Sequence, residues 1–311
     1  MKKLIVILTA LAALTPFRVA AADDCQIVLT PVVDAQYTQI PPSAQSYLET
    51  KLKQMISENG IGMGVRGGQF CLLAKCDLLS KDIIGGAPVV QTQRLSFTFF
   101  IADMLDEKII ASANVEVVSS GSSEAQTYIN AIRRLNAKDW NIQEMIQTGK
   151  EKIIAFYNSN TDAIIKKAQG LASVNSYQQA LFLLTSIPEC SPKYDQAIAA
   201  CRPIFQDFID RACEQNLMAA RSAWAASPNA NGAARAGVFL TNIEPAARCY
   251  GDAVKLYNEI KTSVGEDWKY VLKNYDPRRI QLEQINAYRE IGVAWGNNQQ
   301  PVTTNIFTRL R

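Results

Sequence analysis

The sequence predicts an α+β domain followed by an all-α domain built from helical repeats. Alternating apolar residues indicate half-buried strands in the first half, as at Leu95, Phe97, Phe99 and Ile101. From about Tyr157 onward, only helical spacing of apolar residues remains. This second half also matches itself at a shift of 56 residues, which is typical of stacked helical units.

The first domain, residues 23–157, is expected to run strand, helix, three strands and helix, with one face of the sheet covered. Residues 26–33 form an apolar, β-branched run that includes Pro31, so they are predicted to be an edge strand. The following helix carries its apolar residues at helical spacing, and Asn59-Gly60 ends it. The apolar residues of this helix are Leu48, Leu52, Met55 and Ile56.

Three further strands are predicted over residues 70–77, 94–102 and 108–118, with a hairpin turn at 103–107 between the last two. The inward residues of the last strand are expected to be Ile109, Ala111, Ala113, Val115 and Val117. Ser123 and Gln126 have the spacing of a capping box at the start of the next helix. A further helix, from about Trp140 to Tyr157, carries the chain out of this domain.

The second domain, residues 158–295, contains the internal repeat. Seven positions of one copy match the second copy without a gap: Ala180, Leu184, Thr185, Ile187, Tyr194, Ala197 and Ile198 correspond to Ala236, Leu240, Thr241, Ile243, Tyr250, Ala253 and Val254. A unit that cannot bury its apolar face alone has to stack on its neighbour, so two or three helical hairpins are expected. One helix, from Tyr194 to Ala226 with a possible break at Pro203, must be unusually long.

The type and spacing of six residues in the first copy resemble a tetratricopeptide-repeat unit: Ala168, Leu171, Tyr177, Ala180, Leu184 and Pro192. This resemblance implies two-helix stacking. The 56-residue repeat of this chain differs from the 34-residue repeat of that family, so the resemblance does not imply a peptide-binding groove.

The first domain resembles a known periplasmic α/β domain over roughly residues 26–157. The resemblance rests on these segments: Leu48, Leu52, Met55 and Gly60; the strand at Phe70; LSFTFFIAD at 95–103; KIIASA at 108–113; and GSSEA at 121–125 before Ala131-Ile132. The domain is shared by curli-secretion lipoproteins, cell-wall-synthase-activator lipoproteins and the TolB amino-terminal domain. The resemblance implies protein–protein contact in a Gram-negative envelope without enzyme chemistry. This chain departs from the pattern because it lacks a lipobox.

Residues 1–22 are predicted to be an export signal. Lys2-Lys3 precede an apolar run from Leu4 to Leu14, and Ala20-Ala21-Ala22 supplies a cleavage site before Asp23. The run is shorter than the roughly 20 residues of a spanning helix, so no membrane span and no lipid anchor are expected. The predicted location is periplasmic or secreted, in a Gram-negative-type envelope.

The charge balance excludes nucleic acid as the expected partner. Without residues 1–22 the chain has 29 basic and 29 acidic residues, because the signal contains Lys2, Lys3 and Arg18 and no acid. A neutral surface lacks the field that attracts phosphate groups.

No catalytic residue, metal site or cofactor is predicted, because the chain contains no His and therefore lacks the usual base for Ser or Cys nucleophiles and the usual zinc ligand. Seven Cys remain in the exported chain, and an oxidising compartment would allow them to pair. We expect at least one disulfide among Cys190, Cys201, Cys213 and Cys249. Cys71 and Cys76 are five residues apart in a strand, which places them on opposite faces and argues against a bridge between them.

Several motifs have both a functional and a structural interpretation. Gly62-Met-Gly64-Val-Arg-Gly67 matches a nucleotide-binding pattern but precedes a strand, so a flexible loop is favoured. Residues 119–123 could accept an anion ahead of a helix, although a capped turn is the simpler interpretation. Two other sets are treated in the same way: Asp103, Asp106 and Glu107 as a cation site or solvated turn, and Trp224, Trp268 and Trp295 as stacking platforms or packing anchors.

The tail, residues 296–311, lacks periodicity and is expected to be a flexible end, or alternatively a docking segment through Ile306-Phe307.

The function predicted from the whole sequence is that of an exported, non-enzymatic adaptor or scaffold that binds envelope or secreted proteins. The alternative is an accessory subunit of an oligomeric secretion or cell-surface assembly, with possible homo-oligomers. A hydrolase would have to rely on carboxylates such as Glu266-Asp267.

Overall fold

The computed structural model describes residues 25–34, 38–86, 89–265, 268–273 and 280–299. The elements follow in the order β1 (Val28–Val32), α2 (Pro42–Glu58), β2 (Gly62–Met63), β3 (Phe70–Ile84), β4 (Val90–Asp103), β5 (Lys108–Gly121), α3 (Glu124–Arg134), α4 (Trp140–Ser173), α5 (Tyr177–Thr185), α6 (Tyr194–Ala226), α7 (Ala230–Leu240), α8 (Tyr250–Val264) and α9 (Ile280–Asn297). The predicted fold class, α+β followed by all-α, is confirmed. The predicted signal, residues 1–22, and most of the tail lie outside the described residues.

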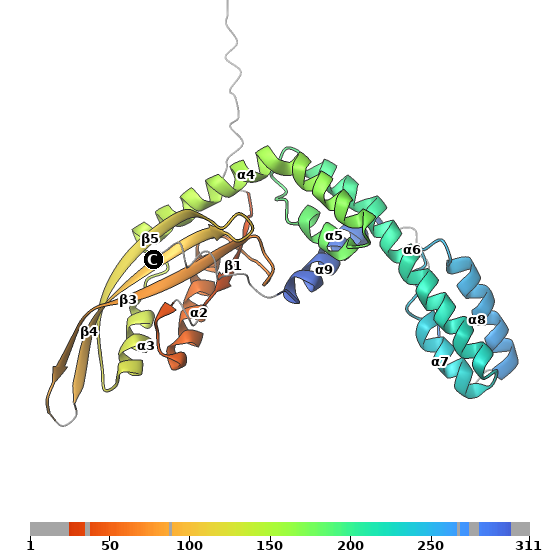
Figure 1. The fold of residues 1–311 in the computed structure, drawn as a ribbon, viewed down its shortest axis with the longest axis horizontal. Coiled ribbons are helices and arrows are strands. Elements are labelled where there is room, and N and C mark those ends of the chain that lie inside the picture. Colours follow the sequence, from red (N-terminus) through yellow and green to blue (C-terminus); the bar gives the residue numbers. More distant parts are fainter. Residues whose placement is uncertain (1–24, 35–37, 87–88, 266–267, 274–279, 300–311) are drawn as a thin grey trace, which may run out of the picture.

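The described residues form an arch (Figure 1). The α/β part lies at one end, α7 and α8 lie at the other, and the long helices α4 and α6 connect them. Among the described residues, no helix combines the length and the hydropathy that a membrane crossing needs.

The sheet has five strands in the order β2-β1-β3-β4-β5. β1 runs parallel to β2 and β3, whereas β3, β4 and β5 are antiparallel neighbours. The alternation predicted for β4 holds: Leu95, Phe97, Phe99 and Ile101 are all fully buried, on the face where the helices pack. α4 approaches β4 closely at Gly149, where an added Cβ would lie 2.4 Å from Cδ1 of Ile101.

The prediction that β1 is an edge strand is wrong, because β2 extends the sheet on its far side. The physical reason for that prediction still applies locally. Gly64 donates its backbone N–H to Leu29 O at 2.9 Å, so alternate residues such as Pro31 direct their backbone nitrogen toward the β2 side. β2 ends opposite Leu29, so Pro31 removes no bond from the ladder.

The face of the sheet opposite the helices is largely polar. Asn114 donates its side-chain N–H to Ser96 and Thr98, and Arg94 pairs with Glu116 at 2.7 Å. Near one end this face also carries a small apolar cluster of Val32, Cys71, Leu73, Phe100, Ala102 and Met104.

The outer edge of β5 is protected by side chains. Lys152, Asn130 and Arg134 donate to the backbone carbonyls of Ile110, Ser120 and Val118, respectively, at 2.6–3.0 Å. These contacts satisfy acceptors that another chain could otherwise pair with.

A register shift between β4 and β5 changes one predicted inward residue. Ala102 pairs with Ile109 and Ile101 pairs with Ala111, so Ile110 is the extra residue of a bulge. Ile109 is therefore 43% exposed, whereas it was expected to face inward, and Ile110 packs against the core instead.

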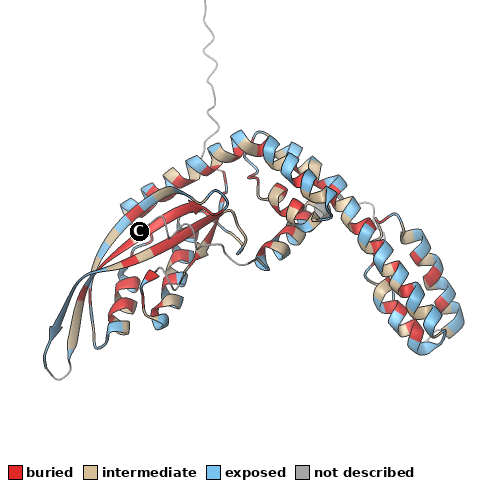
Figure 2. Cartoon of the chain, viewed as in Figure 1, coloured by how far each residue is buried: buried red, intermediate tan, exposed pale blue. Residues whose placement is uncertain are grey.

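The β3–β4 hairpin is longer than predicted, since its strands continue to Ile84 and begin at Val90. Its far half projects beyond α2 and α3 and is mostly exposed (Figure 2). A bulge at Leu79, where Leu78 pairs with Leu95 and Ser80 with Arg94, lies at this transition.

The boundary expected at Tyr157 falls inside α4, which runs unbroken from Trp140 to Ser173. One apolar core extends from the sheet through α4 and α5 to Ile204 of α6. A second core begins at Ile209 and contains α7 and α8. α6 is therefore shared: its first half completes one three-helix unit and its second half starts the next.

Positions separated by 56 residues have equivalent burial in the two units. Three such pairs have no exposed surface: Ala180 and Ala236, Leu184 and Leu240, and Ala197 and Ala253. α6 continues through Pro203 without a break. Proline has no N–H to donate to the carbonyl of Ala199, but Ala199 is exposed, so water can bind that carbonyl instead. α9 does not continue the series after α8. It packs on α5, and the rings of Phe182 and Trp295 lie 5.1 Å apart.

Candidate binding cleft

The glycine motif at 62–67 forms β2 and the loop that follows it. This loop is packed against β1: Thr30 donates its hydroxyl to Val65 O at 2.6 Å, and a Cβ on Gly64 would lie 2.6 Å from the same hydroxyl oxygen. Gly67 donates its N–H to Gly296 O of α9 at 2.9 Å. These close approaches explain the glycines by backbone packing, and they position β2 at the edge of the sheet.

The serine-rich segment 119–123 forms a capped turn. Ser123 Oγ accepts a hydrogen bond from Gln126 N at 3.2 Å, as a capping box requires. The reciprocal half of the box is absent, because the Gln126 side chain donates to Asn130 Oδ1 instead. Ser120 pairs with Thr92, and Ser119 is buried opposite Gln93.

The acidic turn does not gather its carboxylates around one point. Asp103 Oδ1 accepts from the backbone N–H groups of Leu105 and Asp106, and its Oδ2 accepts from Gln69. Asp106 pairs with Lys108 at 3.2 Å. Within the described ranges, no three His, Cys, Asp or Glu side chains come together as potential metal ligands.

The tryptophans take part in helix packing. Trp268 is 9% exposed and donates its indole N–H to Ala233 O at 3.1 Å. Trp224 donates to Glu259 at 3.1 Å, and Trp295 packs on Phe182.

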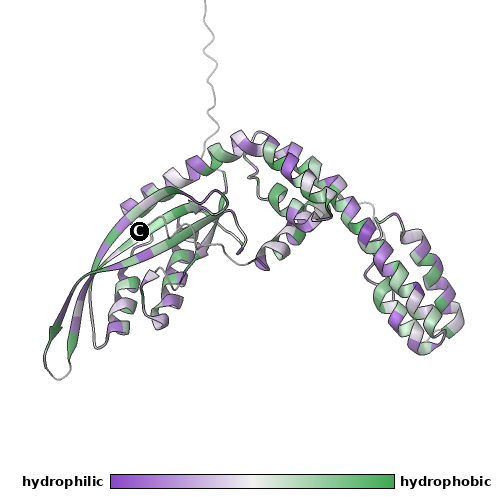
Figure 3. Ribbon diagram, in the orientation of Figure 1, coloured by the Kyte–Doolittle hydropathy of each residue, from purple (hydrophilic) through white to green (hydrophobic). Residues whose placement is uncertain are grey.

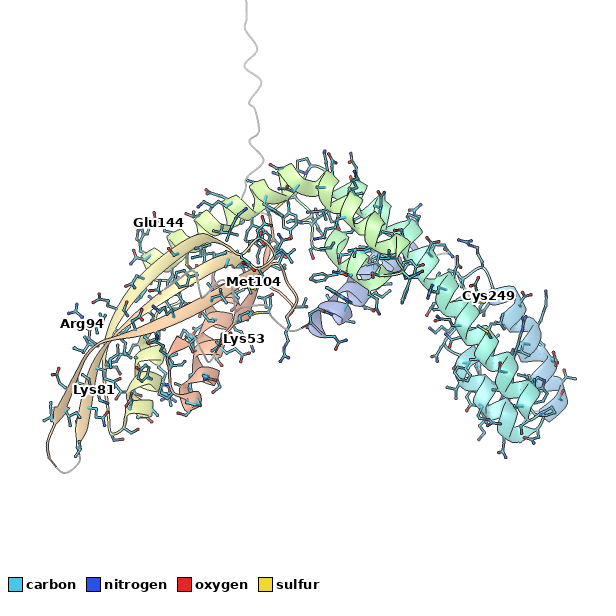
Figure 4. The ribbon with its side chains drawn as sticks, in the orientation of Figure 1. Lys53, Lys81, Arg94, Met104, Glu144 and Cys249 are labelled. Carbon is cyan, nitrogen blue, oxygen red and sulfur yellow. A yellow bond between two sulfur atoms is a disulfide. The ribbon has the colours of Figure 1, made fainter. Side chains whose placement is uncertain are left out.

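The structure contains two disulfides, Cys213–Cys249 and Cys25–Cys190. The first joins α6 to the residue that precedes α8 and falls within the predicted set (Figure 4). Cys190, expected to pair with Cys201 or Cys213, instead reaches back 165 residues to Cys25, just ahead of β1. Cys201 is a free thiol, which corrects its inclusion in that set: it points into the core of the first unit.

The three free thiols are poor nucleophiles. Burial raises the pKa of Cys71, Cys76 and Cys201 to about 12 each, and the charges of Asp103 and Asp77 add to this effect at Cys71 and Cys76. At neutral pH each is a protonated thiol, and the thiolate is the reactive form.

A large hollow lies where the sheet edge meets the helices. It has a volume of about 570 Å³ and is bounded by β1 and β2 on one side, α4 behind, and α5, the α5–α6 turn and α9 on the other. We call it the edge cleft. Its lining residues are Gln26, Ile27, Val28, Met63, Gly64, Val65, Ile153, Tyr157, Phe182, Thr185, Ser186, Ile187, Pro188, Glu189, Cys190, Arg289 and Val293.

Close helix packing holds the far wall of the edge cleft in place. Gly292 of α9 lies so near α5 that an added Cβ would be 2.9 Å from the Phe182 Cα. Gly296 lies against the Phe182 ring and against Val65 in the same way. α9 therefore connects the helical unit to the loop that follows β2.

The two charged lining residues of the edge cleft neutralise each other. Arg289 donates to Glu189 Oε1 at 2.6 Å and to the Tyr194 hydroxyl at 2.8 Å. The hydrogen bond that Arg289 donates to Glu189 raises the pKa of Arg289 above its usual value. The remaining lining is apolar or uncharged, which suits an uncharged ligand better than an ion.

The open edge of the sheet also faces the edge cleft. Gly62 and Gly64 donate their N–H groups to Ile27 O and Leu29 O of β1 at 2.8 and 2.9 Å. In a parallel pair the residue between them directs its N–H and C=O away from β1. Met63 is that residue; it is 48% exposed and lines the edge cleft.

No local sequence pattern predicts this arrangement. Glu189 and Arg289 lie 100 residues apart, and Met63 stands out only as part of a glycine motif. The long-range Cys25–Cys190 bridge, which forms part of the wall, could have been found only by testing every cysteine pair.

Comparison with known proteins identifies no family for this chain. No protein-family model matches it, and no curated protein matches it. One solved structure with some likeness is a minor lipoprotein from Acinetobacter baumannii, with 20% sequence identity and a TM-score of 0.24. The match covers 40% of this chain and 91% of that one.

Proposed function

We propose that this protein is an exported, non-enzymatic adaptor of the cell envelope that holds a partner protein in the edge cleft. The observation that carries the proposal is the composition of that cleft: walls of mixed apolar and polar residues, one ion pair between Arg289 and Glu189, and a strand edge with no backbone partner among the described residues. Such a lining can bind a protein segment, and its one carboxylate, Glu189, is bonded to Arg289.

Export is supported by the two disulfides, because such bridges persist in oxidising compartments such as the periplasm. The predicted signal agrees with this location. The absence of His from the sequence and the protonated state of the free thiols favour a binding role over catalysis. Glu266-Asp267, on which a hydrolase would depend, lies outside the described residues.

The arch supports a scaffold role. The edge cleft lies beside the sheet, whereas α7 and α8 lie at the opposite end, so two partners could bind without touching (Figure 1). In the alternative, accessory subunits of this kind assemble into an oligomer through the α/β domain.

Two measurements test these functions. The mass of the purified, oxidised protein in solution should be that of a monomer, and a ring-sized particle would favour the assembly subunit instead. Immobilised protein should capture a partner from envelope extract, and Val293→Glu should lose it because the new carboxylate would lie in the edge cleft. Val238→Glu, at an exposed position of α7, is the matched control. Equal capture by both variants would exclude the edge cleft as the binding site.

A further inference from the structure

We propose that the edge cleft binds an extended, uncharged segment of the partner, which adds to the sheet as a new strand beside β2. This inference rests on the proposed function and specifies how the partner is held. The added strand would pair with the backbone of Met63, and its side chains would lie against α5 and α9.

The first argument is the unfilled edge. β2 provides only two paired residues, and its outward N–H and C=O at Met63 are directed away from β1. At the opposite edge of the sheet, side chains cover three of the β5 carbonyls. The two edges therefore differ: side chains protect β5 against pairing, whereas no described residue pairs with the outward backbone groups of Met63 in β2.

The second argument is the shape and chemistry of the opposite wall. Phe182 and Val293 line the edge cleft on the side opposite β2, so side chains of an added strand would meet apolar surface there. A volume of about 570 Å³ suits a short segment rather than a folded domain.

The third argument is charge. Arg289 is already bonded to Glu189 and Tyr194, so a carboxylate from the ligand would have to displace an existing partner. A charged ligand side chain would also find no unpaired counter-ion among the described lining residues, because Arg289 and Glu189 already bind each other. The edge cleft therefore selects an uncharged segment.

Met63→Pro isolates the backbone contribution. Proline removes the outward N–H of residue 63 but no bond to β1, because Gly62 and Gly64 make those bonds. Met63→Ala is the matched control, since it shortens the side chain and keeps the N–H. Unchanged thermal unfolding of both variants would show that the sheet is intact.

The experiment selects random heptapeptides displayed on phage against the full, oxidised chain and measures binding of the selected peptides. We expect uncharged sequences with alternating apolar residues, whose affinity falls at least about tenfold with Met63→Pro but little with Met63→Ala. N-methylation of alternate peptide nitrogens should weaken binding similarly, because it removes backbone donors and keeps the side chains.

Three outcomes would overturn strand addition. They are a selection that yields no peptide binding to the edge cleft, a selection dominated by charged sequences, and equal peptide binding to Met63→Pro and Met63→Ala. If peptides bound only after deletion of residues 300–311, this chain would itself supply the occupant and the partner segment would be ruled out. If the envelope partner were lost with Val293→Glu but retained with Met63→Pro, the adaptor function would stand and strand addition would fail.

Discussion

Cys71 and Cys76 illustrate how much a single strand position determines. Their odd spacing places Cys71 in the apolar cluster on the open face and Cys76 in the core under the helices, as predicted. Both remain thiols although the chain forms two disulfides elsewhere. Local spacing was sufficient to predict this separation, whereas the actual bridges depend on which distant segments meet.

The buried thiols should make stability sensitive to alkaline pH. The pKa of Cys201 is about 12 in the folded protein against a reference value of 9.0, so above pH 9 the unfolded chain releases a proton that the folded chain keeps. Stability from this group is complete below pH 9 and decreases as the pH rises toward 12, by about 1.4 kcal/mol per pH unit. Between pH 8 and 10.5, the free energy of unfolding measured in urea should therefore decrease more steeply with pH for the wild type than for Cys201→Ala. Parallel slopes would contradict the assigned burial of this thiol.

The helices and strands were predictable where one face of the element is buried and the opposite face is exposed to solvent. The alternation in β4 and the helical spacing of α2 fix which residues enter the core. The far half of the β3–β4 hairpin lacks such contrast, because residues 78–84 of β3 are exposed on both faces and the hairpin mixes apolar with polar types (Figure 3). The bulge at Ile110 was also not predictable, because Ile109 and Ile110 are the same residue type and either could face the core.

Stacking of equivalent faces predicts equivalent losses at Leu184 and Leu240. Both leucines are completely buried, one in each three-helix unit. Leu184→Ala and Leu240→Ala should each lower the free energy of unfolding of their own unit by about 2–5 kcal/mol. Hydrogen exchange resolved by segment measures each unit separately, and Val238→Ala, which is exposed, should change little. A loss at one leucine only would mean that the 56-residue correspondence is accidental.

The contact between α9 and α5 can be tested with a pair of glycines. Gly292→Ala should destabilise the protein, because its Cβ would lie 2.9 Å from the Phe182 backbone and push the helices apart. Gly170→Ala, in the last turn of α4 with nothing within 4 Å, should instead stabilise the protein by up to about 1 kcal/mol through helix propensity. Thermal unfolding of the two variants should shift in opposite directions. A stabilising Gly292→Ala would show that α9 does not pack this closely.

For the whole molecule, alternation and helical spacing predicted the fold class, but local patterns could not predict how its parts meet. α4 carries the core across the expected boundary at Tyr157, since its inner residues pack first on the sheet and then on α5. The edge cleft arises from this arrangement and from the return of α9. No local motif marks the segments that line the edge cleft, and the cleft forms only because these distant segments come into contact.

The two disulfides should contribute differently to the whole molecule. Cys25–Cys190 closes a separation of 165 residues and Cys213–Cys249 one of 36. The chain-entropy model gives about 5 kcal/mol for the first and about 4 kcal/mol for the second, so replacing either pair by Ala should lower the unfolding free energy substantially. Their effects on binding should separate more clearly. Cys190 lines the edge cleft and Cys25 adjoins Gln26, which also lines it, whereas Cys213 and Cys249 lie in the second core and at its border.

Cys25→Ala with Cys190→Ala should therefore weaken binding of the selected peptides, because β1 and the α5–α6 turn would no longer be held at a fixed spacing. Cys213→Ala with Cys249→Ala should leave that affinity unchanged while still lowering stability, since α7 and α8 are distant from the sheet (Figure 1). Calorimetric titration of both double variants at a temperature where each is folded makes the comparison. Equal weakening by both pairs would mean that the bridges act on binding only through overall stability and that Cys25–Cys190 does not shape the edge cleft.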